Sequence, residues 1–98
     1  MSAPAEDTTE RLATRVAETV GEHPSVHRLH GGDFGAVTTL APGRRVTGVR
    51  MGPPVEVAVV LRLDRPLTEV VDELRQRVQQ LAGDVPVHVT VADVHSEE

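Results

Sequence analysis

The feature that most constrains the fold is the strict alternation of residues 55–63. Apolar side chains occupy every second position there, at Val55, Val57, Val59, Leu61 and Leu63. A period of two is typical of a β-strand with one face on the core. The side chains between them are mixed, so we expect the second face to be less covered. This segment is predicted to be the central strand of a sheet.

A helix is predicted directly after this strand. Apolar residues recur at offsets of three and four from Leu67 to Leu81, which gives a helix one continuous buried stripe. Asp64 is predicted to cap the helix N-terminus and Gly83 to end the helix. Glu73 and Arg77, four residues apart, are predicted to pair on the exposed side.

A second alternating segment runs from Val85 to Val94. Because a strand–helix–strand unit with short connections returns the chain alongside its first strand, we predict that the two strands are parallel. The first half of the chain predicts another helix over residues 8–20, with Gly21 and Pro24 as its stop signal.

Shorter strands are predicted between the two halves. Val26–Leu29 is the first, and Phe34–Leu40 and Arg45–Met51 form a hairpin around a Pro-Gly turn. A regular strand would point Val46 and Val49 to opposite faces. We therefore predict a bulge at the Gly48 between them that turns both inward.

These elements predict an α+β fold: a two-layer α/β sandwich with two helices on one face of a mixed four- to five-stranded sheet. With 98 residues the chain fits one domain. We expect a disordered lead-in over residues 1–7, a single domain over 8–94 and a frayed tail over 95–98.

The composition excludes several classes of site. The chain has no cysteine, which rules out disulfides and thiolate chemistry. Phe34 is its one aromatic residue, so stacking platforms for bases cannot be built. A net charge of −5 repels phosphate backbones at long range. The acidic N-terminus and the short apolar runs predict neither a signal peptide nor a membrane span, so we expect a cytoplasmic protein.

Catalytic, cofactor and metal sites are not predicted. No serine lies in a nucleophile elbow, and the glycines of residues 31–35 match no phosphate-binding motif. The histidines suggest a metal site as an alternative, which would need three or four of them to converge. The spacing of His27 and His30, and of His88 and His95, is instead expected to point each pair apart.

Two surfaces are predicted to bind a partner. The first is the arginine cluster around the hairpin, Arg44, Arg45 and Arg50, since exposed arginine on a defined turn is a frequent anchor in recognition. The second is a flat, weakly apolar strip on the open face of the sheet. It consists of Ala58, Val60, Thr90 and Ala92 and is suited to a protein partner or to self-association.

Several segments carry a family resemblance. Phe34–Leu40, the segment Pro42-Gly43-Arg44-Arg45-Val46-Thr47-Gly48-Val49-Arg50 and the strand–helix–strand unit ending at Val94 resemble the alkaline shock protein family, also called the envelope stress response or general stress protein family, in its short actinobacterial form. The resemblance covers about residues 9–94. Ser25 stands where the family usually has glycine.

The resemblance implies a non-enzymatic cytoplasmic protein that reaches the membrane through a small membrane-anchored partner. It implies no catalytic residues and no cofactor. A homo-oligomer is compatible with both predicted surfaces. The alternative is a small RNA- or nucleic-acid-binding module, because two-layer α/β domains often bind RNA. The acidic charge and the missing aromatic residues argue against that alternative.

Overall fold

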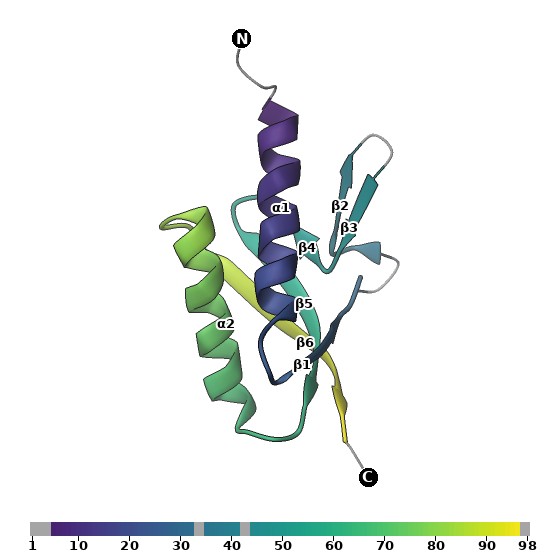
Figure 1. Cartoon of the computed structure of the whole chain (residues 1–98), viewed down its shortest axis with the longest axis vertical. Coiled ribbons are helices and arrows are strands. Elements are labelled where there is room, and N and C mark those ends of the chain that lie inside the picture. Colours follow the sequence, from purple (N-terminus) through teal and green to yellow (C-terminus); the bar gives the residue numbers. More distant parts are fainter. Residues whose placement is uncertain (1–4, 33–34, 42–43, 97–98) are drawn as a thin grey trace.

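The computed structural model describes residues 5–32, 35–41 and 44–96. It has two helices and six strands (Figure 1). The helices are α1 (Ala5–Gly21) and α2 (Leu67–Ala82). The strands are β1 (Val26–Leu29), β2 (Thr38–Ala41), β3 (Arg44–Thr47), β4 (Val49–Arg50), β5 (Val55–Arg62) and β6 (Val87–His95). The predicted α+β class is confirmed.

Strand β5 is the centre of a four-stranded sheet, as the alternation predicted. It pairs in parallel with β6 along its whole length. Its other edge is shared by two short antiparallel strands. β1 lies beside Val59–Leu61 and β4 beside Glu56 and Val57. The main sheet is therefore mixed, and the predicted parallel pairing of the last two strands is confirmed.

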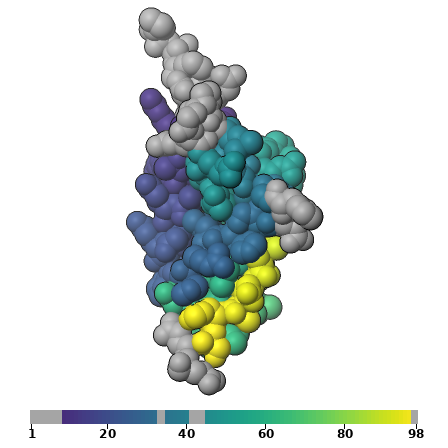
Figure 2. Space-filling model, turned by 90° about the vertical axis from the view of Figure 1, so that its right-hand side faces the viewer, coloured from purple at the N-terminus to yellow at the C-terminus, as the bar shows by residue number. Residues whose placement is uncertain are grey.

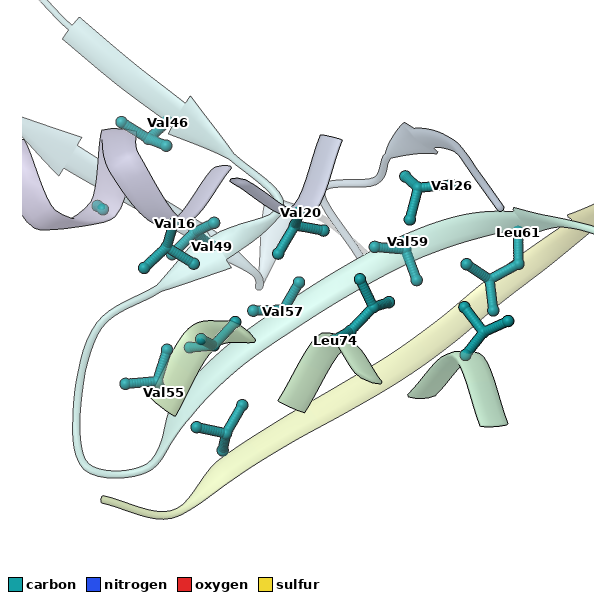
Figure 3. Packing of buried hydrophobic residues seen from close by; sticks show 14 residues of the cluster. Val16, Val20, Val26, Val46, Val49, Val55, Val57, Val59, Leu61 and Leu74 are labelled. Atoms are coloured by element: carbon teal, nitrogen blue, oxygen red, sulfur yellow. The ribbon is translucent and has the colours of Figure 1, made fainter. Parts of the chain in front are cut away.

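The core lies between this sheet and the two helices (Figure 3). Alternate side chains of β5 point toward the helices, and the apolar stripes of α1 and α2 cover them. The cluster is built mainly from valine because the chain has almost no aromatic volume to bury. Its fully buried members from β5 and the helices are Val55, Val57, Val59, Leu61, Ala13, Val16, Val20, Val70, Leu74 and Val78.

The hairpin forms a second sheet of its own. β2 and β3 pair antiparallel, from Thr38 opposite Thr47 to Ala41 opposite Arg44, and stand beside α1 (Figure 1). Gly48, with φ of 88°, separates β3 from β4. Val46 and Val49 on either side of it are both buried, as predicted. The predicted single strand with a bulge was wrong, because Gly48 divides it into two strands of different sheets.

Two predicted boundaries in the first half were wrong. The hairpin strand begins at Thr38, not at Phe34, because the N–H of Val37 donates to the Gly31 carbonyl and closes a turn first. Phe34 itself lies outside the described residues. α1 begins at Ala5, three residues earlier than expected. The acids that follow Ala5 favour the N-terminal turn of a helix, which explains the extension.

Two predicted contacts of α2 were also wrong. Its N-cap residue is Pro66, which makes no side-chain capping bond, and Asp64 is used elsewhere. Glu73 contacts Arg65 and His23 instead of pairing with Arg77. Both carboxylates bond to residues just after α1: Asp64 to Ser25, and Glu73 to His23. These partners are distant in the sequence, so local spacing does not predict the contacts.

Candidate functional site

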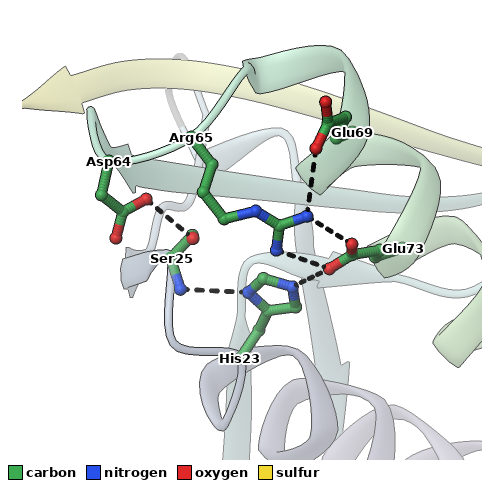
Figure 4. Close-up of polar contacts among 6 residues, drawn as sticks. All are labelled: His23, Ser25, Asp64, Arg65, Glu69 and Glu73. Carbon is green, nitrogen blue, oxygen red and sulfur yellow. Dashed lines mark hydrogen bonds and ion pairs between the residues drawn. The ribbon is translucent and has the colours of Figure 1, made fainter.

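A polar network connects the C-terminal end of α1 to the first half of α2 (Figure 4). His23 follows α1 and is buried, with 2% of its surface exposed. Its Nδ1 accepts the backbone N–H of Ser25 at 3.0 Å, so the ring proton lies on Nε2, which donates to Glu73 Oε1 at 2.8 Å. The network thus links the α1 end, the start of β1 and the middle of α2.

This network contains a serine, a histidine and carboxylates, but it is not arranged for nucleophilic catalysis. The Ser25 hydroxyl donates to Asp64 Oδ1 at 2.8 Å, and only the backbone of Ser25 reaches the imidazole. A general base must contact the hydroxyl proton that it removes. Ser25 is also buried. The arrangement therefore has a structural role: it connects the segment after α1 to α2 and to the loop after β5.

The electrostatics of the network centre on Glu73. Hydrogen bonds from Arg65, and next from His23, lower the pKa of Glu73 to about 2. Donating hydrogen bonds to Glu73, and next to Glu69, raises the pKa of Arg65. Because Arg65 lies at the surface, with its guanidinium partly in water, the ion pair is screened by solvent.

The predicted arginine cluster is divided between the two sheets. Arg45 lies on the hairpin opposite Leu40, and Arg50 lies in β4 of the main sheet. Both are exposed. Arg50 forms an ion pair with Glu56 at 3.4 Å. The backbone of Arg44 belongs to β3, but its side chain lies outside the described part of the chain.

The predicted apolar strip is wrong for its two central members. Ala58 and Val60 point away from the helices, yet they are 0% and 3% exposed. Both are short, and the positions paired with Val60 on the flanking strands carry the longer side chains of Arg28 and Asp93. Neither can therefore contact a partner. Thr90 and Ala92 on β6 are exposed, as predicted.

The open face instead carries several arginine and histidine positions. Cross-strand partners share a face of a sheet. Arg28 is paired with Val60, Arg50 with Glu56, and His95 with Arg62. All of these positions alternate away from the core. His88, also paired with Glu56, adds a second imidazole on the same side.

The rings of His27 and His95 meet across this face. Their centroids are 4.0 Å apart and their planes are nearly parallel. β1 and β6 lie on opposite edges of β5, so the stack bridges the strand between them. Figure 2 shows the C-terminal part of β6, in yellow, against the blue segment that contains β1.

Sequence reasoning missed this stack for an identifiable reason. A bulge between Val26 and Arg28, and another before Asp93, interrupt the alternation on which the predicted directions of His27 and His95 depended. The one signal was compositional: the strands are unusually rich in arginine and histidine. Arg62 was missed as well, and its guanidinium donates to the carbonyls of Pro24 and Val26.

Charge is separated between the elements. The six strands hold five arginines and two acids, a net charge of +3, within a chain whose formal charge is −5. The strands also contain three of the five histidines of the chain. The acids lie mainly on the helices and in the loops. Two of the five arginines, Arg44 and Arg45, belong to the hairpin sheet. The main sheet holds the other three and both acids, a net charge of +1, so its open face is a weakly cationic surface on an acidic protein.

A shallow hollow of about 260 Å³ lies at the end of this face. It is lined by Arg62, Leu63, Asp64, His95 and Ser96. The guanidinium of Arg62 and the carboxylate of Asp64 both line it, so the hollow favours neither an anionic nor a cationic ligand. Within the described ranges, no three or more histidine, aspartate and glutamate side chains are grouped to hold a metal ion.

No protein-family model matches the chain, and neither does any curated protein or any solved structure. In the part of the chain that the structure describes, no helix is long and apolar enough to span a membrane.

Proposed function

We propose that this protein is a non-enzymatic partner-binding domain of the envelope stress response type, and that its cationic sheet face binds an acidic segment of a protein partner. The observation that carries the proposal is the charge separation between strands and helices. Surfaces of opposite charge steer two proteins together and fix their orientation.

The residues best placed for this contact are Arg28 and Arg50. Both are exposed and lie on the same side of the main sheet. Arg50 is held by Glu56 at 3.4 Å, a distance from which an incoming carboxylate can compete. Arg62 is half-buried and bonded to two carbonyls of the chain, so we assign it a supporting role.

A protein partner fits this face better than a nucleic acid does. Nucleic-acid binders combine basic grooves with aromatic platforms or base-reading loops, and the chain has one aromatic residue and a net charge of −5. The resemblance of its segments to the alkaline shock protein family supports the same choice. On that basis we propose a cytoplasmic location, with recruitment to the membrane through the partner.

The test is cross-linking in intact source cells, followed by purification and mass spectrometry of the attached molecules. The variant Arg28→Glu/Arg50→Glu is compared with Arg11→Glu/Arg15→Glu, which makes the same charge change at exposed positions of α1. We expect a small membrane-anchored protein with wild type and with the α1 variant. Its recovery falls at least about tenfold with the sheet variant.

Two results would contradict the proposal. Recovery of RNA or ribosomal proteins in place of a membrane-anchored protein would favour the nucleic-acid module. Equal recovery of the partner with both variants would remove the sheet face as the interface. A third variant, Arg44→Glu/Arg45→Glu, tests whether the hairpin binds the partner instead.

A further inference from the structure

The outer edge of β6 is the starting point. In a parallel pair, alternate residues direct both their N–H and C=O groups to the neighbouring strand. The N–H of Val55 donates to the Pro86 carbonyl, so the even-numbered residues at the start of β6 bond to β5. Val87, Val89 and Val91 therefore direct their backbone groups away from it, toward the unpaired edge.

Both ends of this edge are closed by charged side chains of the chain itself. Arg75 Nε donates to the Val87 carbonyl at 3.3 Å. Asp93 Oδ1 accepts the backbone N–H of Val94 at 2.8 Å. Side-chain caps of this kind shorten an exposed edge and limit uncontrolled strand addition.

Between the two caps lies an open window at Val89 and Val91. Their outward N–H and C=O groups have no partner among the residues that the structure describes. An antiparallel copy of β6 centred on Thr90 places Val89 opposite Val91 and Val91 opposite Val89. Each such pair exchanges two hydrogen bonds, so all the open groups of both copies are satisfied.

We infer that a second copy of this chain pairs with the first through this window, forming a two-fold symmetric dimer. The window is self-complementary, as a two-fold interface requires. The proposal does not rest on the partner-binding function, because it uses the edge of the sheet and not its cationic face.

Side chains around the window support the same pairing. Thr90 meets its own symmetry mate on the open face, where threonine pairs are favourable. Val89 and Val91, both half-buried in one chain, meet each other on the helix side.

The consequence is a continuous sheet of twice the width. The open faces of the two copies lie on the same side of it, since a two-fold axis perpendicular to the sheet keeps each face on its own side. The cationic surface of one copy thereby continues into that of the other.

The test measures amide hydrogen exchange and sedimentation of the full chain over a range of protein concentrations. Exchange of the Val89 and Val91 amides slows as concentration rises, and the sedimenting mass doubles. The Thr90 amide, bonded to β5 within one chain, exchanges slowly at every concentration and serves as the internal reference. The inference would be overturned if the chain sedimented as a monomer at all concentrations. It would also be overturned if the exchange rates of the Val89 and Val91 amides did not change with protein concentration.

Variants locate the contact. Thr90→Arg places two arginines face to face at the axis and raises the dimer dissociation constant at least about tenfold. Thr47→Arg makes the same exchange at an exposed threonine of β3 and leaves the dimer intact. If Thr90→Arg dimerises as wild type does, the interface lies elsewhere.

Discussion

At the scale of single residues, position 48 is the one where the fold most strongly requires glycine. Its φ of 88° lies in the left-handed region, which side chains with a Cβ rarely adopt. A Cβ there would also lie 2.7 Å from Cβ of Leu29. Gly48 lets the hairpin strand turn into the main sheet while β1 passes beside it.

Replacing Gly48 by alanine is therefore expected to destabilise the protein by about 2–4 kcal/mol, from backbone strain and overpacking together. Urea denaturation measures the change. Gly21→Ala is the matched control, because nothing lies within 4 Å of a Cβ at that helical position. It should be neutral or stabilising by up to about 1 kcal/mol. Equal effects of both substitutions would contradict this account of Gly48.

The Glu73 carboxylate makes stability depend on pH. Its pKa is lowered from 4.5 to about 2 by Arg65 and His23. A lowered pKa in the folded state contributes stability above the unfolded value, and this contribution is lost as the pH falls through the folded value. We expect the loss between about pH 4.5 and pH 2.

Glu73→Gln removes this ionisation. The gap in urea midpoint between wild type and the variant should be widest above pH 5 and narrow steadily toward pH 2. Arg77→Gln, which changes a charge one turn away without entering the His23 network, is the control. A gap that stays constant over this range would show that Glu73 contributes by packing alone.

At the scale of elements, α2 stabilises the fold through its buried stripe. Leu74 is fully buried between the sheet and α1, whereas Leu63, of the same type, is 57% exposed after β5. The two leucines are eleven residues apart in the sequence, and only Leu74 belongs to the core. This contrast separates the contribution of burial from that of residue type.

Leu74→Ala is expected to lower the free energy of unfolding by about 3 kcal/mol, from lost burial and the cavity left behind. Leu63→Ala should change it by less than about 1 kcal/mol. Thermal or urea unfolding of both variants provides the comparison. A similar loss at both positions would contradict the packing described here.

The elements also show what sequence patterns can and cannot predict. β5, α2 and β6 were predicted because their periodicity is continuous and strong. The separate hairpin sheet was not, because its separation depends on how Gly48 turns the chain against α1, a tertiary effect. The His23–Glu73 contact joins residues fifty positions apart, so no local spacing reveals it.

At the scale of the whole molecule, the candidate site was only partly predicted. Arg45, Arg50, Thr90 and Ala92 were correctly expected to be exposed. Ala58 and Val60 were not: both are buried, and the strands on either side of Val60 carry longer side chains at the paired positions. Arg28 and His95 join the cationic face only through two bulges that reverse the alternation of β1 and β6, and a bulge without glycine leaves little trace in the sequence.

The most direct test of the central claim is a nuclear magnetic resonance titration of the full chain with a glutamate-rich peptide at low ionic strength. We predict shifts of backbone amides confined to β1, β4 and the open-face positions of β6, which vanish as salt screens the charges. Shifts that cluster on α1 or α2, or no shifts at all, would contradict the proposal that the cationic sheet face is the partner-binding surface.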